Sequence, residues 1–171
     1  PIFKKGNGGD VTCYRPISLL DSTVKILGRI LLARLEDWVN TNTLPPPQYG
    51  FRRGRGAEDQ CLNLSLLVDK YTIAKGGQIY LGFMDLSNAF DCMVDSKLWI
   101  IMEDFGVDRS IINMIRDKYS DASARFRFGN NGECSESFKI HRGVRQGCTF
   151  APFLFNLYIN NLDIALLNKC L

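Results

Sequence analysis

The sequence has little of what would identify a zinc protein, a secreted protein or a membrane protein. Its 171 residues include one histidine, His141, and none of the six cysteines stands in a C-x-x-C pair. A zinc site is therefore not indicated. No segment resembles a signal peptide, and no apolar run is long enough to span a bilayer. We expect free thiols in a reducing, intracellular compartment, with nucleus and cytoplasm both open.

The chain also lacks a large charge of either sign. Its formal net charge is +3, which does not indicate a general polycation. The basic residues are clustered, however, first at Arg52, Arg53 and Arg55 and later at Arg125, Arg127, Lys139, Arg142 and Arg145. Such clusters either bind phosphates or form solvated faces. With 46% hydrophobic residues, the chain can form one domain with a core, or a large part of one.

The spacing of apolar residues predicts helices and strands without the regular alternation of a doubly wound sheet. Helical spacing occurs at 21–38, 57–71, 98–105 and 150–167, and after Asp108, which can cap a helix over 111–119. Alternation at 122–128, a turn at 129–132 and a return strand at 137–140 predict a hairpin. The expected fold class is α+β, helix-rich with a small antiparallel sheet.

Asp85 stands at the end of a short apolar run, residues 79–84, that follows Gly76 and Gly77. A run of this length after a turn signal predicts a buried strand. A lone carboxylate at its end is costly unless it binds a cation or caps a turn or helix. The residues alone leave both interpretations open. Magnesium would suit the first, because it takes one or two protein carboxylates and fills its shell with water and phosphate oxygens.

Further candidates carry cations or amides. The loop at 143–148 offers Arg145, Gln146 and Gly147, whose missing side chain lets a ligand approach the main chain, although the same pattern also describes an ordinary turn. Arg15 and Lys5 suit phosphates as a bidentate and a point-charge partner, or are surface charges.

Taken together, these pieces resemble the reverse transcriptase domain of non-LTR (LINE-type) retrotransposons. The resemblance runs in order through nearly the whole chain: PIFKKG at 1–6 with YRPISLL at 14–20, QYGFRRGR at 48–55, FMDLSNAFD at 83–91, and GVRQGC at 143–148 with Pro152 and LFNLYI at 154–159. Four motifs in this order and spacing make the resemblance specific.

The resemblance implies a role for each matching residue. Asp85 would be a catalytic magnesium ligand, with the Leu86 carbonyl as a second contact. Phe90 would pack under the incoming sugar and disfavour a 2′-hydroxyl, whereas Asp91 is expected to be structural. Gln146 and Gly147 would border the nucleotide and template, and Arg15 with Lys5 would hold the triphosphate. Template or primer backbone would be contacted by Arg52, Arg55 and Arg145.

Two departures from the family pattern limit this interpretation. Ala151 replaces the serine that commonly precedes the motif's proline. The aromatic-Ala-Asp-Asp motif, which would supply the remaining metal-binding carboxylates, is absent, since no two aspartates are adjacent. The chain also begins without methionine. We therefore expect a fragment that ends before this motif and does not catalyse by itself.

The resemblance thus implies a right-hand polymerase, with fingers at 1–75 and an incomplete palm at 76–171. The reaction would be RNA-directed DNA synthesis with two Mg²⁺ ions, an RNA template, a DNA primer and deoxynucleotide triphosphates, and no membrane. One alternative is a noncatalytic remnant that binds at most RNA. Another palm-type nucleotidyltransferase would explain Asp85 but not the finger motifs. The oligomeric state, the host element and the priming site stay open.

Overall fold

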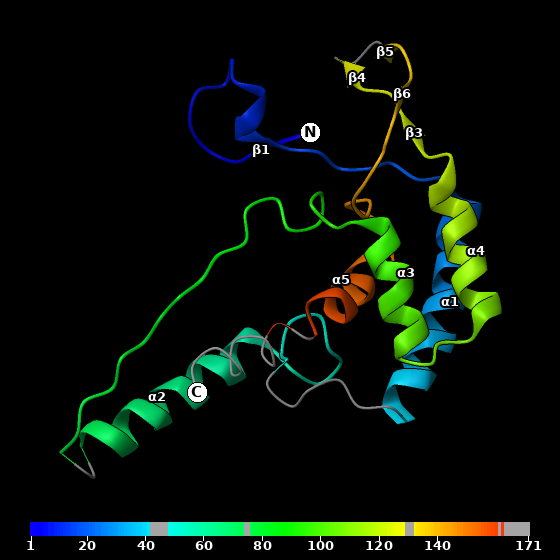
Figure 1. Cartoon of the computed structure of the whole chain (residues 1–171). Helices are drawn as coiled ribbons and strands as arrows, with labels where there is room; N and C mark the ends of the chain where they lie inside the picture. The colour runs from blue at the N-terminus through cyan, green and yellow to red at the C-terminus, as the bar shows by residue number, and fades with distance from the viewer. Residues whose placement is uncertain (42–47, 74–75, 129–131, 161, 163–171) are drawn as a thin grey trace.

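The computed structural model describes residues 1–41, 48–73, 76–128, 132–160 and 162. Within these residues, helices carry most of the regular structure, and two-residue strands form three antiparallel pairs. Four helices, α1, α3, α4 and α5, lie together, whereas α2 extends away from them (Figure 1). The expected class, helix-rich α+β with small antiparallel sheets, is confirmed at this level.

Helix α3 (Asp95–Asp104) begins three residues before the predicted stretch at 98–105, and α4 (Arg109–Ser120) follows the predicted cap at Asp108. Gly106 ends α3 with φ +75°, a left-handed conformation that favours glycine. Asp108 then caps α4, and its carboxylate accepts a hydrogen bond from the Ser110 N–H at 2.7 Å. The hydrogen bonds from the Ser110 side chain and backbone hold the pKa of Asp108 below its ordinary value. Both predicted helices are confirmed.

Helices α1 (Ser22–Thr41) and α5 (Ala151–Ile159) complete the core. Helix α5 is apolar on most of its surface, which suits a central position covered by the other helices. Gly28 of α1 lies close to it, since a Cβ there would come within 3.3 Å of the Phe150 ring. The helix predicted at 150–167 is confirmed as far as Ile159. Beyond it, residues 161 and 163–167 lie outside the described residues.

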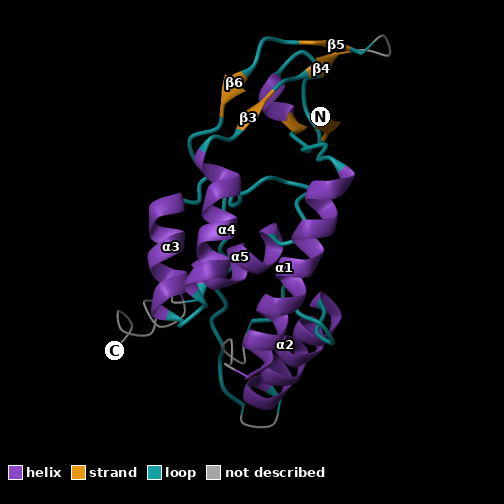
Figure 2. Cartoon of the chain, turned by 90° about the vertical axis from the view of Figure 1, so that its right-hand side faces the viewer, coloured by secondary structure: helices purple, strands orange, loops and turns teal. Residues whose placement is uncertain are grey.

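The predicted hairpin is confirmed and projects beyond the helices (Figure 2). Strands pair as β3 (Ser123–Ala124) with β6 (Phe138–Lys139), and β4 (Arg127–Phe128) with β5 (Glu133–Cys134). Between the two pairs, the Phe126 N–H donates to the Ser135 hydroxyl at 3.0 Å. A side-chain oxygen thus replaces a carbonyl at this point, and the strands are interrupted. Of the predicted turn at 129–132, only Gly132 is described.

The N-terminal segment forms the third pair, β1 (Ile2–Phe3) with β2 (Tyr14–Arg15), joined through a 3-10 helix at Val11–Cys13. Five described cysteines are free thiols: Cys13, Cys61, Cys92, Cys134 and Cys148. None of the described helices is long and apolar enough to cross a membrane.

The segment between α2 (Ala57–Thr72) and α3 differs from the sequence-based expectation. Residues 79–84 are extended, as predicted, but belong to no sheet and are mostly exposed, with Tyr80 at 89% and Phe83 at 84%. A strand is completed by a neighbour that bonds its N–H and C=O groups, and no other described segment pairs with this one. The prediction of a buried strand is therefore wrong for this structure. Figure 1 shows the segment as the long green trace from α2.

Candidate functional site

The loop at 143–147 is fastened to the turn at 90–93 by main-chain contacts. The Val144 N–H donates to the Phe90 carbonyl at 3.0 Å, and the Gly143 N–H donates to the Met93 carbonyl at 2.9 Å. Gly143 has φ +89°, and a Cβ there would lie 2.8 Å from the Asp91 Cα and from the Phe90 carbonyl oxygen. A side chain larger than hydrogen has no room at this contact. Glycine thus allows two motifs far apart in the sequence to lie against each other.

A side-chain hydrogen bond joins the same two segments. The Gln146 amide nitrogen lies 3.3 Å from Asp91 Oδ1 and 3.2 Å from Asp91 Oδ2, and both side chains are half-buried. The structure therefore brings together Phe90, Asp91 and Gln146, a contact that the sequence analysis did not predict. It gives Asp91 a contact that links the two motifs.

Gly147 is held against the extended segment that follows β2. Its φ is +110°, and a Cβ would lie 2.8 Å from the Ser18 carbonyl oxygen. On the same segment, the Ser18 N–H donates to the Gln146 carbonyl at 2.7 Å. The close approach at Gly147 needs a residue without a side chain. The N-terminal motif is thus fixed beside the loop at 143–147.

Phe90 lies within a group of aromatic rings. It stacks on Phe155 of α5 with ring centroids 4.9 Å apart, and it meets the edge of Phe51 at 6.1 Å. Offset stacking and edge-to-face contacts are favourable beyond the area they bury. Phe51 itself is 65% exposed and has φ +55°. The ring of Phe90 is therefore fixed from α5 and partly exposed.

Asn156 was given no role by the sequence analysis, yet it fixes the second motif. It is 1% exposed, donates to the Gly50 carbonyl at 2.8 Å and accepts from the Gln48 side chain at 3.0 Å. A buried amide must be satisfied in this way. The available signal was a lone polar residue within the apolar stretch at 150–159.

The arginines predicted to contact nucleic acid lie in two parts of the chain. Arg52 and Arg55 are half-buried, with Arg52 Nη1 donating to the Gln48 carbonyl at 3.3 Å and Arg55 over the Tyr49 ring at 5.1 Å. Burial, and then the charge of Arg55, lowers the pKa of Arg52.

Arg145 is also half-buried and makes contacts of the same kind with α4. Its Nη2 donates to the Lys118 carbonyl at 3.0 Å, and its guanidinium lies over the Tyr119 ring at 5.5 Å. A cation in this position stabilises the C-terminal turn of α4. The Arg145 Nε, however, is buried without a hydrogen-bond partner among the described residues, so these contacts do not satisfy the whole guanidinium.

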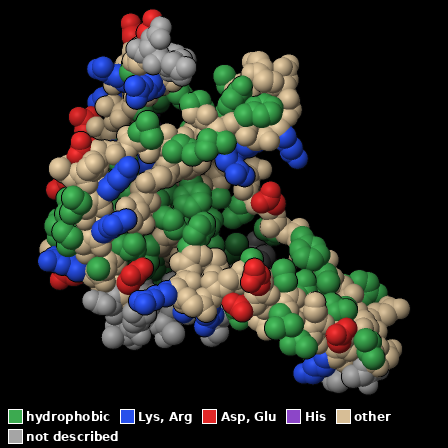
Figure 3. All heavy atoms as spheres, turned by 180° about the vertical axis from the view of Figure 1, so that it is seen from behind, with side chains coloured by type: hydrophobic (Ala, Val, Ile, Leu, Met, Phe, Trp, Pro, Cys, Tyr) green, Lys and Arg blue, Asp and Glu red, His purple; other side chains and the backbone are tan. Residues whose placement is uncertain are grey.

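The remaining predicted residues are exposed. Lys5 and Arg15 lie on the N-terminal segment, and Asp85 and Leu86 lie at the end of the extended segment before the turn. Figure 3 shows the far face of the molecule, which is hollowed, with hydrophobic side chains at its centre and basic side chains on both sides.

A divalent metal needs more donors than this structure assembles. Among the described residues, no three His, Cys, Asp or Glu side chains cluster closely enough to hold an ion. Asp91, six residues beyond Asp85, is already the acceptor for Gln146. The described residues therefore do not form a metal site by themselves, and Asp85 can be only one ligand of such a site.

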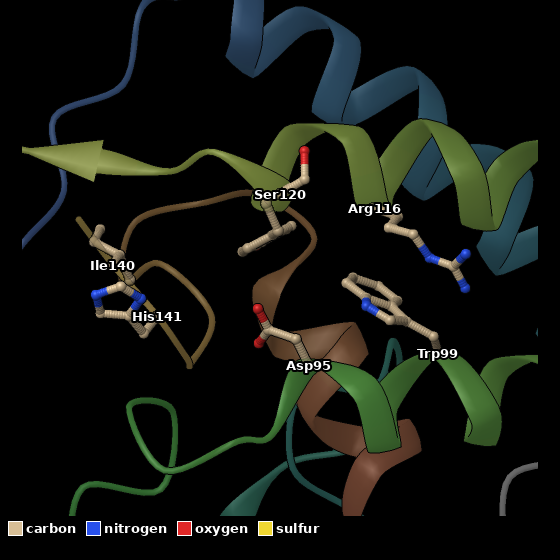
Figure 4. Close-up of a pocket in the computed structure, with 7 residues that line it drawn as sticks. Asp95, Trp99, Arg116, Ser120, Ile140 and His141 are labelled. Carbon is tan, nitrogen blue, oxygen red and sulfur yellow. The ribbon is translucent and has the colours of Figure 1, made fainter.

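The structure also contains a pocket of about 280 Å³ between α3, α4 and the end of the hairpin. Figure 4 shows Asp95 and Trp99 on one side, Arg116 and Ser120 on the other, and His141 with Ile140 at one end. Burial raises the pKa of Asp95 above its ordinary value. None of the residues predicted for the site lines this pocket.

Comparison with known proteins identifies the class to which this arrangement belongs. Residues 2–170 match the family model described as reverse transcriptase (RNA-dependent DNA polymerase). The chain belongs to this family, and the expected resemblance to non-LTR retrotransposon polymerases is confirmed.

Particular relatives carry the same assignment. The chain is 32% identical over 164 residues to the Retrovirus-related Pol polyprotein from type-1 retrotransposable element R2 of Popillia japonica, which is 94% of this chain and 22% of that protein. It is 28% identical over 149 residues (87% of this chain, 14% of that protein) to the corresponding R2DM polyprotein of Drosophila melanogaster. It is 31% identical over 153 residues (87% and 16%) to the RNA-directed DNA polymerase from mobile element jockey of Drosophila funebris. The chain thus spans less than a quarter of each of these relatives.

Proposed function

We propose that this chain is the fingers and part of the palm of an RNA-directed DNA polymerase, with fingers at 1–75 and palm at 76–171. The observation that carries the proposal is the family match over residues 2–170. Contact between the Phe90–Asp91 turn and the Gln146–Gly147 loop supports it, because two of the resembling motifs meet in space. The reaction is attack of a primer 3′-hydroxyl on the α-phosphate of a deoxynucleotide, with pyrophosphate leaving.

Each site residue has a proposed part in nucleotide binding. Phe90, fixed by Phe155, lies beneath the sugar and excludes a 2′-hydroxyl by its bulk. Gln146 and Gly147 border the nucleotide and the template strand. Arg15 and Lys5, both exposed, hold the triphosphate as charge partners.

The template and primer backbones are contacted by Arg52 and Arg55, whose phosphate contacts position nucleic acid without reading sequence. Arg145, whose Nη2 donates to the Lys118 carbonyl of α4, is proposed as a third contact of the same kind. The partners are accordingly an RNA template, a DNA primer and deoxynucleotide triphosphates, within the cell.

Asp85 is proposed as one ligand of a magnesium ion, with the Leu86 carbonyl as a neighbouring oxygen. In this family the two ions supply charge stabilisation for the attacking and leaving oxygens. The described residues offer one exposed carboxylate for that purpose. The remaining ligands must come from elsewhere in the active enzyme.

The incomplete donor set also supports a second candidate: the 171-residue chain binds RNA without catalysis. Its affinity would then depend steeply on salt, because phosphate binding releases counterions. Binding that is steep in salt and unchanged by Asp85→Ala, together with no primer extension, is expected for the isolated chain. Absence of RNA binding at low salt would exclude this candidate.

The polymerase proposal is tested by primer extension on a poly-A template with a chimera. Residues 2–170 replace the matched region of the Popillia japonica relative, so the rest of the enzyme is supplied. We expect incorporation that falls at least about 100-fold in Asp85→Ala, as a lost electrostatic contact in an active site predicts. Asp117→Ala, at an exposed carboxylate on α4, is the matched control. Undiminished incorporation by the Asp85→Ala chimera would contradict the proposal.

A further inference from the structure

Asp91 contacts a residue of the proposed nucleotide site but has no part of its own in the proposed function. Its carboxylate accepts from the Gln146 amide nitrogen, at 3.3 Å to one oxygen and 3.2 Å to the other. The two residues are 55 positions apart, so this contact joins separate motifs. Its partner, Gln146, is a side chain that we propose to border the nucleotide.

The chemistry of the pair fixes which end of the amide faces the carboxylate. An ionised carboxylate only accepts hydrogen bonds, so the NH₂ end of Gln146 must lie towards Asp91. The two nearly equal distances place the nitrogen between both carboxylate oxygens. The amide oxygen of Gln146 is thereby turned away from Asp91 and left as an acceptor for another partner.

The backbone contacts cannot fix the amide in this way. Hydrogen bonds from Gly143 and Val144 hold the main chain of the loop but leave the rotatable bonds of the Gln146 side chain undetermined. Ordering a long side chain of this kind costs rotamer entropy. A contact made before the nucleotide arrives removes this cost from binding.

We propose that Asp91 is a positioning residue, which orients the Gln146 amide with its oxygen available to a hydrogen-bond donor of the incoming nucleotide. The inference rests on the proposed function for its nucleotide. Asp91→Asn removes the preference for one orientation of the Gln146 amide, because an asparagine can present either its oxygen or its nitrogen to Gln146.

The first test needs no activity and uses the 171-residue chain. The side-chain amide signal of Gln146 in a ¹H–¹⁵N spectrum should move towards that of a solvent-exposed amide in Asp91→Asn. It should stay unchanged in Asp121→Asn, a control with the same charge change at an exposed site paired with Lys139. The urea midpoint should be nearly unchanged, because the main-chain contacts remain. An unmoved Gln146 signal in Asp91→Asn would overturn the proposal.

The second test measures single-nucleotide incorporation by the chimera. Asp91→Asn should raise the nucleotide KM roughly tenfold, a usual effect of losing one hydrogen bond to a charged group, with a small change in kcat. In a Gln146→Ala background the same substitution should have no further effect on KM. A purely structural role would give additive effects, and that result would overturn the proposal. If the unsubstituted chimera incorporates nothing, the proposed function fails, and the Gln146 signal alone decides whether Asp91 orients the amide.

Discussion

Replacing Gly143 by alanine tests how much folding free energy depends on the close contact between the Phe90–Asp91 turn and the loop at 143–147. Its φ is +89°, and the added Cβ would lie 2.8 to 2.9 Å from three backbone atoms of Phe90 and Asp91. Gly106 is a matched control, because its φ is +75° and a Cβ there meets nothing within 4 Å. Alanine at Gly106 should cost about 1 kcal/mol, for the left-handed backbone alone.

At Gly143 the same backbone cost is joined by a clash with main-chain atoms that cannot rotate away. Overpacking of this kind costs about 1–3 kcal/mol, so Gly143→Ala should destabilise the fold by about 3 kcal/mol in total. That is a large part of a typical stability of about 5–15 kcal/mol.

Urea unfolding followed by tryptophan fluorescence is the assay, because Trp99 lies in the core. A difference of about 2 kcal/mol between the two variants corresponds to roughly 1 M in the midpoint. Equal midpoints for Gly106→Ala and Gly143→Ala would refute the reasoning, since the close approach would then carry no energetic cost.

Three further substitutions test other parts of the structure. Asn156→Ala leaves the Gly50 carbonyl without its hydrogen bond and should lower the free energy of unfolding by about 1–3 kcal/mol. Trypsin should then cleave faster at the arginines after Gly50, and an unchanged cleavage rate would show that Asn156 does not hold this segment in place. Asp95→Asn should raise stability near neutral pH, because burial raises the pKa of Asp95 and thus penalises its charge in the folded state. This gain should vanish in acid, where wild-type Asp95 is protonated in both states, and a pH-independent gain would exclude ionisation as its cause. Phe155→Leu removes the ring stacked on Phe90 and, in the chimera, should weaken discrimination against ribonucleotides several-fold. The measurement is the ratio of kcat/KM for the deoxynucleotide to kcat/KM for the ribonucleotide, and an unchanged ratio would show that Phe155 does not support this discrimination.

The sequence predicts elements that are specified locally. Gly106 and Asp108 act through conformation and hydrogen bonds within a few residues. The end of α3 and the start of α4 can therefore be predicted from the sequence. The hairpin likewise follows from alternation and turn residues.

Features that depend on distant partners could not be read in this way. The run at 79–84 has the composition of a strand. A strand also needs a partner strand, however, and the residues of the run do not show whether one is present. The hydrogen bond from Arg145 to the Lys118 carbonyl depends on α4 lying beside the loop, and the residues around Arg145 do not show this. The bond between Gln146 and Asp91 also appears only when two separated motifs meet.

The extended segment before α3 has a consequence for how the protein must be handled. Residues 76–84 are uncharged, expose Tyr80, Phe83 and Met84, and pair with none of the described strands. Such segments add to copies of themselves and form aggregates unless a charge interrupts them. Asp85 is the charged residue that ends this run, in the position where a charge limits aggregation of such a segment.

Substituting Asp85 by an uncharged residue therefore changes two properties at once. It removes the proposed metal ligand and also extends the uncharged stretch from Gly76 to Phe90. Inactivity of Asp85→Ala is informative only for protein shown to be monodisperse by sedimentation. Asp85→Glu, which keeps the charge and alters the position of the carboxylate, separates loss of chemistry from loss of solubility.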